Sequence, residues 1–457
     1  MTAPARTLQR VPLPRAWSVR ASDLAALAIG NAVLIGAMWV RHGQLAELGS
    51  PSGILIAAGQ LAALYGTYLV LLQLILMSRS PWLDQVLGSD RVAALHRWVG
   101  FSGILLLVAH GIFTVVGYGL ATGSGVLAEA LTILTSYPYV LMATAGMALF
   151  VAIGISSVGA VRRRLSYETW YGLHLYAYLA IALAFLHQLA VGTDFTTDPV
   201  ARLYWIALYV VAGALMLIFR FAQPVTLSLR HRLRVANVVE EAPGVVSIYM
   251  TGRDLDQLAT RAGQWFRWRF LTPEDWWRSH PFSLSAAPNG RFLRVTVKAQ
   301  GDQTQKLQRV RIGTPVFLEG PYGNMTGAAR TRPKVLLIAG GIGVTPLRAL
   351  LEELPAAPGD LTLVYRASRP QDLVFRRELE QLSAIRGATV HYLVGRRGTR
   401  AMPGDPLAPE ALRRLVPDVR QHDVYVCGPL PMMEAVRRSL RALHVPDAQV
   451  HDERFAF

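Results

Sequence analysis

The chain is almost devoid of cysteine: Cys427 is the one cysteine among its 457 residues. A single thiol excludes an intramolecular disulfide, a covalently attached c-type haem and a cysteine-ligated iron–sulfur cluster, because each of these needs two or more cysteines. If the chain binds a metal, histidine must supply the ligands.

Acidic residues are also scarce, with 30 Asp and Glu against 46 Lys and Arg and a formal net charge of +16. No basic stripe with interleaved aromatic residues accompanies this charge, so we expect no nucleic-acid partner. Topology signals, anionic lipid headgroups and a phosphate-bearing cosubstrate account for the charge better. The calcium-binding pattern D-x-D-x-D-G is absent too, so regulation by calcium would need another chain.

Long hydrophobic runs, by contrast, are plentiful. Hydrophobic residues make up 52% of the chain, and the mean hydropathy is +0.31. Each run is about the length that crosses the hydrocarbon core of a bilayer as a helix. The first run ends in Met38, Trp39 and Val40 rather than in small residues, which favours a retained helix over a cleavable signal peptide. We predict six spans, at residues 23–40, 53–77, 95–118, 137–160, 171–192 and 202–220.

The loop charges predict the orientation of these spans. Arginines precede the first span, flank the second loop and form the fourth loop: Arg6, Arg10, Arg15, Arg20, Arg79, Arg91, Arg97, Arg162, Arg163 and Arg164. The intervening loops carry Glu47, Glu129, Asp194 and Asp198 instead. Because positively charged flanks stay on the cytoplasmic side, both termini are expected in the cytoplasm of a protein integral to the plasma or inner membrane.

Two predicted spans each contain a pair of histidines. His96 and His110 lie 14 residues apart in the third span, and His174 and His187 lie 13 apart in the fifth. Ionisable side chains inside a bilayer are functional by default. A separation of this length is roughly 20 Å along a helix, which suits axial ligands of two stacked haems, His96 with His174 and His110 with His187. The interval of 13 requires a tilt, a kink or a π-bulge in the fifth helix.

The composition changes after Arg220 to mixed polar and β-branched residues. Short alternating runs broken by turn residues predict strands at 234–239, 245–250, 264–270, 292–298 and 315–318, and hence a small antiparallel barrel. From Lys334 onward, strands and helices alternate, which predicts a parallel sheet with helices on both faces. The chain is therefore multi-domain: a segment 1–22, a six-helix transmembrane bundle 23–222, an antiparallel β-barrel 223–330 and an α/β Rossmann-like domain 331–457.

Four motifs stand out in the soluble half. One is the strand His280-Pro281-Phe282-Ser283-Leu284-Ser285, and another is the segment from Val297 to Thr304, which includes Lys298 and Gly301. The third, Ala339-Gly340-Gly341-Ile342-Gly343-Val344-Thr345-Pro346, follows a strand and precedes a helix, as a glycine-rich phosphate loop requires. The fourth is Tyr425-Val426-Cys427-Gly428-Pro429.

The two histidine pairs followed by these motifs resemble the NADPH oxidase and ferric reductase superfamily. The spacings of 14 and 13 are those of the NADPH oxidase branch, and the resemblance covers nearly the whole chain after about residue 20. It implies that the four histidines ligate two haem b groups, that the barrel binds FAD, and that the α/β domain binds NAD(P)H.

The resemblance also implies roles for individual residues. The flavin would lie on the strand of His280, Pro281, Phe282 and Ser283, its pyrophosphate at Lys298, Gly301 and Thr304, and the dinucleotide at Gly340, Gly341, Gly343, Thr345, Pro346, Gly428 and Pro429. Ser283, Cys427 and the terminal Phe457 would act at the site of hydride transfer, with Phe457 covering the flavin. Arg366, Ser368 and Arg369 follow the second strand of the α/β domain, where cations suit a ribose 2′-phosphate and favour NADPH over NADH.

These parts predict electron transfer from NADPH through FAD and two haems to an acceptor on the outer face. With both axial positions taken by histidine, reduction would be outer-sphere, giving superoxide from dioxygen. Arg41 and His42, just past the first span, would either place positive charge near this anion or extend to the interface by snorkelling. The alternatives are a ferric-chelate reductase, a haem-binding membrane protein with a regulatory nucleotide domain, and electron delivery to a protein or quinone partner. The oligomeric state stays open.

Overall fold

A computed structural model describes residues 19–396, 398, 402 and 404–453. The chain divides into two compact units. The first comprises residues up to Leu72 together with Trp98–Leu208, and the second comprises Gln73–Arg97 together with the chain from Tyr209 onward.

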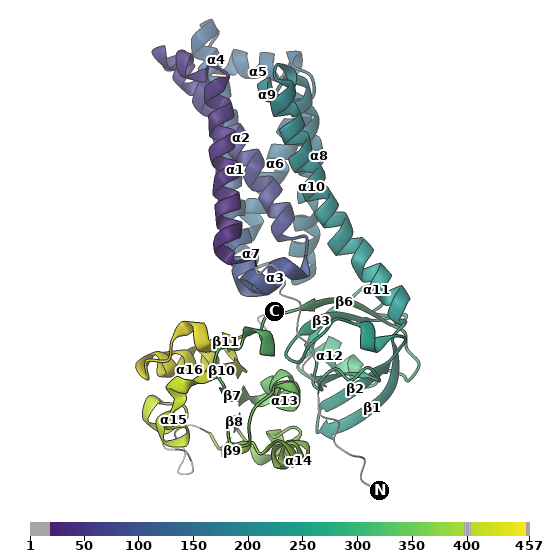
Figure 1. The fold of residues 1–457 in the computed structure, drawn as a ribbon. Helices are drawn as coiled ribbons and strands as arrows, with labels where there is room; N and C mark the ends of the chain where they lie inside the picture. The colour runs from purple at the N-terminus through teal and green to yellow at the C-terminus, as the bar shows by residue number, and fades with distance from the viewer. Residues whose placement is uncertain (1–18, 397, 399–401, 403, 454–457) are drawn as a thin grey trace. The chain divides into compact units, whose positions relative to one another are not determined.

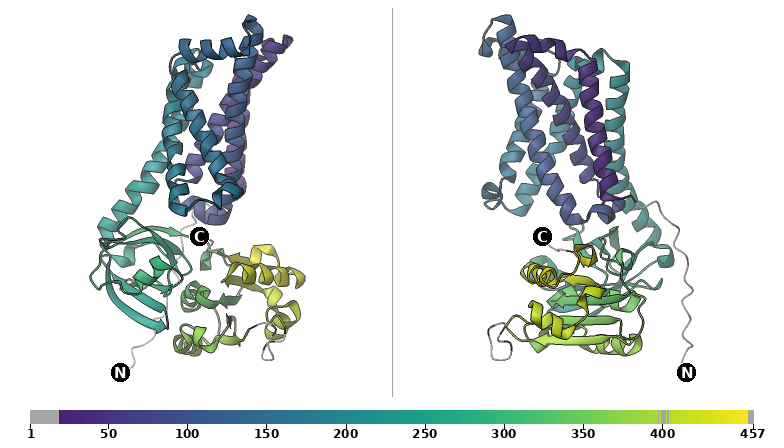
Figure 2. Two further views of the ribbon diagram at one scale, coloured as in Figure 1. Left: turned by 180° about the vertical axis from the view of Figure 1, so that it is seen from behind. Right: turned by 60° about the vertical axis from the view of Figure 1, so that its left-hand side comes forward.

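Within the described residues, six helices are long and apolar enough to cross a membrane, as the hydrophobic runs predict. They are α1 (Ala21–Arg41), α2 (Pro51–Leu76), α4 (Ser89–Thr122), α6 (Val140–Ser157), α8 (Tyr167–Val191) and α10 (Pro199–Leu217), the last continuing into α11 (Gln223–His231). A helix satisfies its backbone polar groups within the segment, so an apolar run of this length is stable as a helix in lipid. Figure 2 shows these helices from two further sides.

The sixth helix is longer than predicted. It passes through a π-helical turn, Ile218–Ala222, and ends at His231 rather than near residue 220. In the π-turn, Gln223 donates its N–H to the carbonyl of Ile218, five residues back. The polar extension is held by the barrel, since the Ser228 hydroxyl accepts the N–H of Leu318 at 3.1 Å. The expected boundary at 222 therefore falls inside a continuous helical segment.

The fifth helix, α8, is α-helical from Tyr167 to Val191. The π-turn thus occurs in the sixth helix, where Pro224 lacks the N–H that would continue the α-helical pattern.

A short helix that the sequence did not predict, α5 (Val126–Ser136), follows the third span and lies across one end of the bundle (Figure 1). Its Glu129 is buried and accepts hydrogen bonds from the hydroxyls of Thr122, at 3.0 Å, and Ser124, at 2.9 Å. Leu127 on the same helix is 85% exposed. Eleven residues are too few to span a bilayer, so the hydrophobic pattern alone did not distinguish α5 from a loop.

The predicted barrel consists of two three-stranded antiparallel sheets in the orders β1-β2-β5 and β4-β3-β6. The strands are β1 (Arg234–Ala242), β2 (Val245–Thr251), β3 (Trp265–Phe270), β4 (His280–Ser283), β5 (Leu293–Lys298) and β6 (Val316–Tyr322), with α12 (Asp302–Leu307) after β5. Isolated bridges from Arg234 to Pro315 and from Leu284 to Val295 connect the two sheets. Phe266, Trp268 and Ile248 fill the interior and are fully buried.

The predicted α/β domain contains a parallel sheet in the order β11-β10-β7-β8-β9. Its strands are β7 (Lys334–Gly340), β8 (Leu361–Ala367), β9 (Thr389–Val394), β10 (His422–Cys427) and β11 (Val450–Asp452). Helices α13 (Val344–Glu353) and α14 (Arg376–Arg386) cover one face, and α15 (Pro409–Leu415) and α16 (Leu430–Ala442) cover the other.

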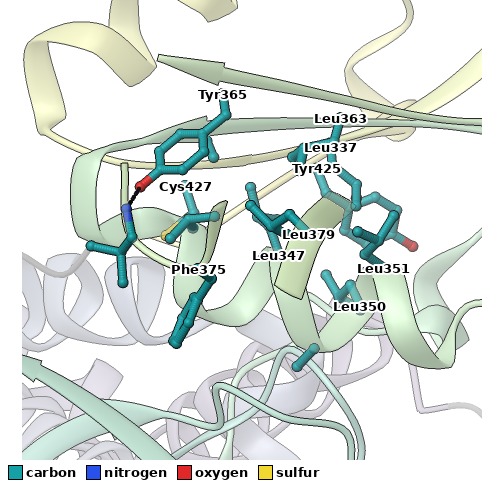
Figure 3. Close-up of a cluster of buried hydrophobic side chains, with 14 of the residues drawn as sticks. Leu337, Leu347, Leu350, Leu351, Leu363, Tyr365, Phe375, Leu379, Tyr425 and Cys427 are labelled. Atoms are coloured by element: carbon teal, nitrogen blue, oxygen red, sulfur yellow. Dashed lines mark hydrogen bonds between the residues drawn. The ribbon is translucent and has the colours of Figure 1, made fainter. Parts of the chain in front are cut away.

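The core of this domain is made of leucines and tyrosines from the sheet, α13 and α14 (Figure 3). Tyr365 in this cluster accepts the N–H of Val374 at 3.1 Å and donates to the carbonyl of Gly341 at 3.1 Å. The strand order reverses on either side of β7, which creates a crevice at the carboxyl ends of the strands.

Candidate functional site

A cavity of about 500 Å³ opens where the carboxyl ends of β7 and β8 meet the loop after β10. Its lining includes six residues that the sequence assigned to cofactor binding: Lys298, Gly340, Gly341, Arg366, Ser368 and Pro429. Doubly wound sheets bind their ligands at this edge, where the strand order reverses. The structure therefore brings the glycine-rich loop and part of the expected ribose site together.

The cavity also contains charged residues that the sequence analysis missed, namely Asp372, Arg396 and Asp405. Arg396 follows β9 much as Ser368 follows β8, so the rule that ligands bind beyond strand ends could have found it. Arg369 forms an ion pair with Asp372, its Nη2 lying 3.2 Å from Oδ1. Hydrogen bonding from Arg369 lowers the pKa of Asp372, so this carboxylate is charged at neutral pH.

The glycine-rich loop packs closely against the end of β10. A Cβ at Gly343 would lie 2.4 Å from the carbonyl oxygen of Cys427, and a Cβ at Gly428 would lie 3.0 Å from the Cα of Gly340. Gly341 has a φ of +54°, which glycine adopts without strain. Because no side chain fits at Gly343 or Gly428, the backbone of the loop is free of side chains at the cavity. A bound pyrophosphate requires such access to backbone N–H groups.

Thr345 and Pro346 lie in the first turn of α13 and are buried. The Thr345 hydroxyl donates to the carbonyl of Ile342 at 3.0 Å. Both residues thus shape the turn that leads from the glycine-rich loop into the helix.

The expected flavin strand is β4, paired with β3 so that Ser283 lies opposite Trp265 and His280 opposite Trp268. The rings of His280 and Phe282 are parallel within 3°, with their centroids 6.0 Å apart. Burial lowers the pKa of His280; nearby Asp275 opposes this effect and Arg278 adds to it, and the net pKa lies below the usual value, so the imidazole is neutral at pH 7. His280 therefore supplies no positive charge to the expected flavin strand.

The side chain of Ser283 is buried, and its hydroxyl has no hydrogen-bond partner among the described residues. Buried hydroxyls in folded proteins are almost always hydrogen-bonded, so this group calls for a polar partner that the protein does not supply. A flavin ring nitrogen fits that need.

The segment after β5 carries Lys298, Gly301 and Thr304. The Thr304 hydroxyl accepts the N–H groups of Gln300, at 2.8 Å, and Gly301, at 3.1 Å. No atom lies within 4 Å of a Cβ at Gly301, so space is open for a ligand beside its backbone. Lys298, expected at the flavin pyrophosphate, also lines the cavity at the dinucleotide loop.

Cys427 ends β10 and is 1% exposed. Burial raises the pKa of its thiol, and the carboxylates of Glu453 and Asp452 add to the rise. The thiol is therefore protonated and is not a nucleophile. Phe457, the third residue predicted at the hydride-transfer site, lies outside the described residues.

Glu453 was not identified from the sequence. It is buried, and the indole N–H of Trp265 donates to its Oε1. Burial raises the pKa of Glu453 well above the usual range. A lone glutamate near a chain end carries no sequence signal, because its burial depends on contacts with β3.

Within the first unit, the rings of His110 and His187 are close enough to interact electrostatically. The Nδ1 of His110 lies 3.0 Å from the carbonyl oxygen of Gly59, and the Nδ1 of His187 lies 2.5 Å from that of Ala184. A carbonyl only accepts hydrogen bonds, so Nδ1 carries the proton in both rings and Nε2 holds a lone pair. This is the tautomer that a histidine needs in order to ligate a metal through Nε2.

The other two histidines belong to different units, His96 to the second and His174 to the first. The His96 carbonyl accepts the side-chain amide of Gln73 at 2.6 Å, and the ring of His174 packs on Trp170 with centroids 5.0 Å apart. Among the described residues, no group of three or more His, Cys, Asp or Glu is placed to hold a metal ion. A ligand set of two histidines per metal remains the arrangement that the sequence predicts.

His42 follows the first span and contacts two aspartates. Its Nδ1 lies 3.0 Å from Asp194 Oδ1, and its Nε2 lies 2.9 Å from Asp198 Oδ2. Asp198 also pairs with Arg41, whose side chain is 58% exposed. Both ring nitrogens of His42 therefore contact carboxylates, whereas the Arg41 side chain is mostly exposed.

Three parts of the chain match known protein families. Residues 62–185 match the family described as "Ferric reductase like transmembrane component". Residues 232–326 match an "FAD-binding domain", and residues 337–438 match an "Oxidoreductase NAD-binding domain". The chain has the ferric reductase and NADPH oxidase-like architecture. It is an integral membrane oxidoreductase with FAD-binding and NAD-binding domains.

Relatives of this ferric reductase-like protein include a monooxygenase reductase subunit and a flavohemoprotein. The glycine betaine monooxygenase reductase subunit of Chromohalobacter salexigens is 30% identical over 188 residues, 38% of this chain and 50% of that protein. The flavohemoprotein of Pseudomonas aeruginosa is 33% identical over 231 residues, 49% of this chain and 58% of that protein. The chain therefore spans between half and three fifths of the length of these curated relatives.

One similar solved structure is the FAD/NAD-binding domain of a nitric oxide dioxygenase from Vibrio cholerae. It is 26% identical and covers 50% of this ferric reductase-like chain and 99% of its own chain, with a TM-score of 0.40.

Proposed function

We propose that the protein oxidises NADPH in the cytoplasm and passes the electrons through FAD and two bis-histidine haem b groups to dioxygen on the outer face, forming superoxide. Both termini would then lie in the cytoplasm, as the arginine-rich loops favour. The six spans and the FAD- and NAD-binding domains support a route across a membrane.

The observation that carries the proposal is the bonding of His110 and His187. Each ring donates from Nδ1 to a backbone carbonyl, which leaves Nε2 as the metal-binding nitrogen. A haem iron held by both side chains would have no open coordination position, so it would pass electrons to an acceptor without binding it. His96 and His174 would hold the second haem in the same way.

The cavity at the carboxyl edge of the parallel sheet would hold NADPH. Arg366 donates to the carbonyls of Ala367 and Leu393, which places its charge beside Ser368 at the ribose end. Lys298 adds a second positive charge to the lining. Two cations and a hydroxyl suit a 2′-phosphate, which supports NADPH rather than NADH.

FAD, when bound, accepts a hydride and releases its two electrons one at a time. The chain's own residues would orient this chemistry. The unpartnered hydroxyl of Ser283 would hydrogen-bond the flavin ring, and Phe282 would pack against it. Cys427 would remain a neutral thiol beside the nicotinamide, and Phe457 would cover the flavin until the nicotinamide enters.

A second candidate is reduction of a ferric chelate. Arg41 carries an exposed positive charge at the end of the first span, where an anionic chelate would be attracted. The redox core would be the same, and only the final acceptor would differ.

Spectroscopy of the purified full-length protein tests the proposal. We expect a reduced-minus-oxidised spectrum of two low-spin haems per chain and a flavin absorbance that NADPH bleaches. Dye reduction sensitive to superoxide dismutase would identify dioxygen as the acceptor, whereas persistent ferric-chelate reduction without oxygen would favour the second candidate. A protein that binds haem but leaves the flavin oxidised in the presence of NADPH would contradict both.

A further inference from the structure

An arginine of the barrel is buried where the barrel meets the α/β domain. Arg294 lies on β5 and is 4% exposed. Its Nε donates to the hydroxyl of Ser285 at 3.1 Å, and its Nη1 donates to Oε2 of Glu378, in the first turn of α14, at 3.2 Å. Both domains belong to the second compact unit. Because a buried guanidinium needs partners for its donors, Arg294 holds a barrel residue and an α14 residue at a fixed separation.

On the barrel side, Arg294 contacts the segment that continues the expected flavin strand. Its Nη2 donates to the backbone carbonyl of Ser285, two residues after Ser283. The Ser285 hydroxyl also accepts the hydroxyl of Thr296 at 2.7 Å, and the Ser247 hydroxyl lies 2.8 Å from that of Thr296. All four of these hydrogen-bonded side chains are buried. The position of the backbone just after Ser283 therefore depends on Arg294.

On the α/β side, the same guanidinium contacts the start of α14. Its central carbon lies 4.7 Å from the ring centroid of Phe375, a cation–π contact. Phe375 has a φ of +62°, in the left-handed region that bulky residues rarely adopt, so its contacts must hold it there. Glu378 also pairs through Oε1 with Arg348 of α13, which is 5% exposed. One glutamate thus bridges two buried arginines, one from each domain.

Hydrogen bonds connect the start of α14 with the glycine-rich loop. The N–H of Val374, the residue before Phe375, donates to the Tyr365 hydroxyl at 3.1 Å. That hydroxyl donates to the carbonyl of Gly341 at 3.1 Å. Tyr365 and Phe375 both belong to the buried cluster in Figure 3. A continuous series of contacts therefore leads from the segment after the flavin strand, through Arg294, to the dinucleotide loop.

Hydride transfer depends on the relative position of these two segments. A hydride leaves the nicotinamide with both electrons of its C–H bond and bonds to the flavin, so the two reacting atoms must approach to about 3 to 3.5 Å. The barrel matches an FAD-binding domain and the α/β domain an NAD-binding domain, so each reacting atom belongs to a different domain. A displacement of about 1 Å between them would lower the rate about 100-fold without removing either cofactor.

We propose that Arg294 is a positioning residue for hydride transfer, which together with Glu378 holds the segment after Ser283 against the start of α14 and so sets the distance between flavin and nicotinamide. This role rests on the proposed function, because it requires NADPH to reduce the flavin. Arg294 acts through Ser285 and Phe375, so it is not itself a catalytic residue. Its loss lowers the rate of hydride transfer per bound flavin, whereas the loss of a merely stabilising contact lowers only the amount of folded protein.

The test compares Arg294→Met and Glu378→Ala with the control Arg376→Met in the full-length protein. Arg376 is the first residue of α14, and its exposed side chain pairs with Glu380 on the same helix at 3.0 Å. The control thus removes an arginine and an ion pair from α14 but leaves the contact with the barrel intact. Other contacts still join the two domains in all three variants, such as that from the N–H of Ala287 to Oε2 of Glu352 at 2.8 Å.

The measured quantity is the rate of flavin bleaching at saturating NADPH without oxygen, divided by the amount of bound FAD. We expect Arg294→Met and Glu378→Ala each to lower this limiting rate at least about tenfold. The NADPH concentration that gives half the limiting rate should change much less, because the cavity residues at the ribose end are unaltered. The control should retain both values.

The double variant tests whether the two side chains act as one unit. If they do, Arg294→Met combined with Glu378→Ala is no slower than Arg294→Met alone. An unchanged limiting rate per bound FAD in either single variant, or a loss confined to FAD content and unfolding temperature, would overturn the positioning role. Glu378→Ala, at a partly exposed side chain, decides the question if Arg294→Met does not fold.

Flavin bleaching by NADPH in the unsubstituted protein tests the proposed function separately. No bleaching there would refute the proposed function. Bleaching at one rate in the unsubstituted protein and all variants would refute only the role of Arg294.

Discussion

Arg79 and Glu319 form an ion pair although 240 residues separate them in the sequence: Nη1 of the arginine lies 2.8 Å from Oε1 and 3.0 Å from Oε2 of the glutamate. The glutamate is buried, and it also accepts the hydroxyl of Tyr322 at 3.0 Å. Arg79 precedes α3 (Pro81–Leu87), so this pair fastens the loop after the second span to β6 of the barrel within the second unit.

Glu319→Gln should destabilise this attachment. Burial alone would raise the pKa of Glu319, but Arg79, together with Arg267 and Tyr322, outweighs burial and the net pKa is lowered. A lowered pKa contributes stability above the unfolded value of about 4.3, and this stability is lost as the pH falls through the folded value. At pH 7 we expect a loss of about 3 kcal/mol, because Arg79 keeps its charge without its partner. Thermal unfolding against pH in detergent measures both effects.

The control for this prediction is Glu380→Gln, since Glu380 pairs with Arg376 on an exposed helix face at 3.0 Å. An exposed pair of this kind contributes at most about 1 kcal/mol. Equal losses in the two variants at pH 7 would mean that the buried pair is no stronger than a surface pair.

Gly343→Ala should disrupt the dinucleotide loop. The new Cβ would lie 2.4 Å from the backbone oxygen of Cys427, and backbone atoms cannot move aside as a flexible side chain can. We expect a destabilisation of about 1 to 3 kcal/mol, typical of overpacking, together with weaker NADPH binding. Gly159→Ala is the control, because no atom lies within 4 Å of its Cβ and the residue lies outside the expected cofactor sites. A Gly343→Ala protein with unaltered unfolding temperature and NADPH affinity would contradict the packing argument.

The features that the sequence predicted are those with local causes. The six spans follow from uninterrupted apolar runs, and the strand and helix alternation after Lys334 follows from periodicity. The continuation of the sixth helix to His231 was missed because it depends on Ser228 bonding to β6. Asp84 was missed for a similar reason, since an ordinary acidic residue in a loop becomes buried through contact with Gly323, far along the chain.

The residues of the candidate site also fall into two groups: those that a local motif predicts and those whose place depends on contacts between distant parts of the chain. Gly340 and Gly341 are recognisable because a phosphate loop demands glycine between a strand and a helix. Asp372 and Arg396 line the same cavity without a motif, because their positions depend on how strand ends meet. The ion pair that Arg369 forms with Asp372 could not be predicted from the position of Arg369 after β8.

His280→Gln should change the pH dependence of the barrel. Burial lowers the pKa of His280, so the unfolded chain takes up a proton more readily than the folded one. The stability contributed by the neutral ring is complete above the unfolded value of about 6.5 and is lost as the pH falls through the lower folded value. We expect unfolding temperature and FAD retention to fall with acidification in this range, and less so in the variant.

His444→Asn, at an exposed turn where φ is +57°, is the control for this experiment. It should reproduce the acid sensitivity of the unsubstituted protein. If His280→Gln lost FAD at the same pH as the unsubstituted protein, the buried imidazole would not be the group responsible.

Ser368→Asp should reverse the preference between nucleotides. Ser368 lines the cavity beside Arg366, where the 2′-phosphate of NADPH is proposed to bind. A carboxylate there would repel the phosphate but could accept hydrogen bonds from the ribose hydroxyls of NADH. We expect the KM for NADPH to rise about tenfold relative to that for NADH, equivalent to about 1.4 kcal/mol. Ser383→Asp on α14 is the control, and an unchanged KM ratio in Ser368→Asp would place the phosphate elsewhere.

His110→Leu should remove one haem. Leucine fills similar space but supplies no nitrogen to the iron, and His187 alone would hold the haem weakly. We expect the reduced-minus-oxidised spectrum to fall from two low-spin haems to one per chain and superoxide formation to stop, while NADPH still bleaches the flavin. Thr114→Val is the matched control, because the Thr114 hydroxyl lies 3.3 Å from Nδ1 of His110 and the Gly59 carbonyl still fixes the tautomer. Two haems retained in His110→Leu would show that the ligand lies elsewhere.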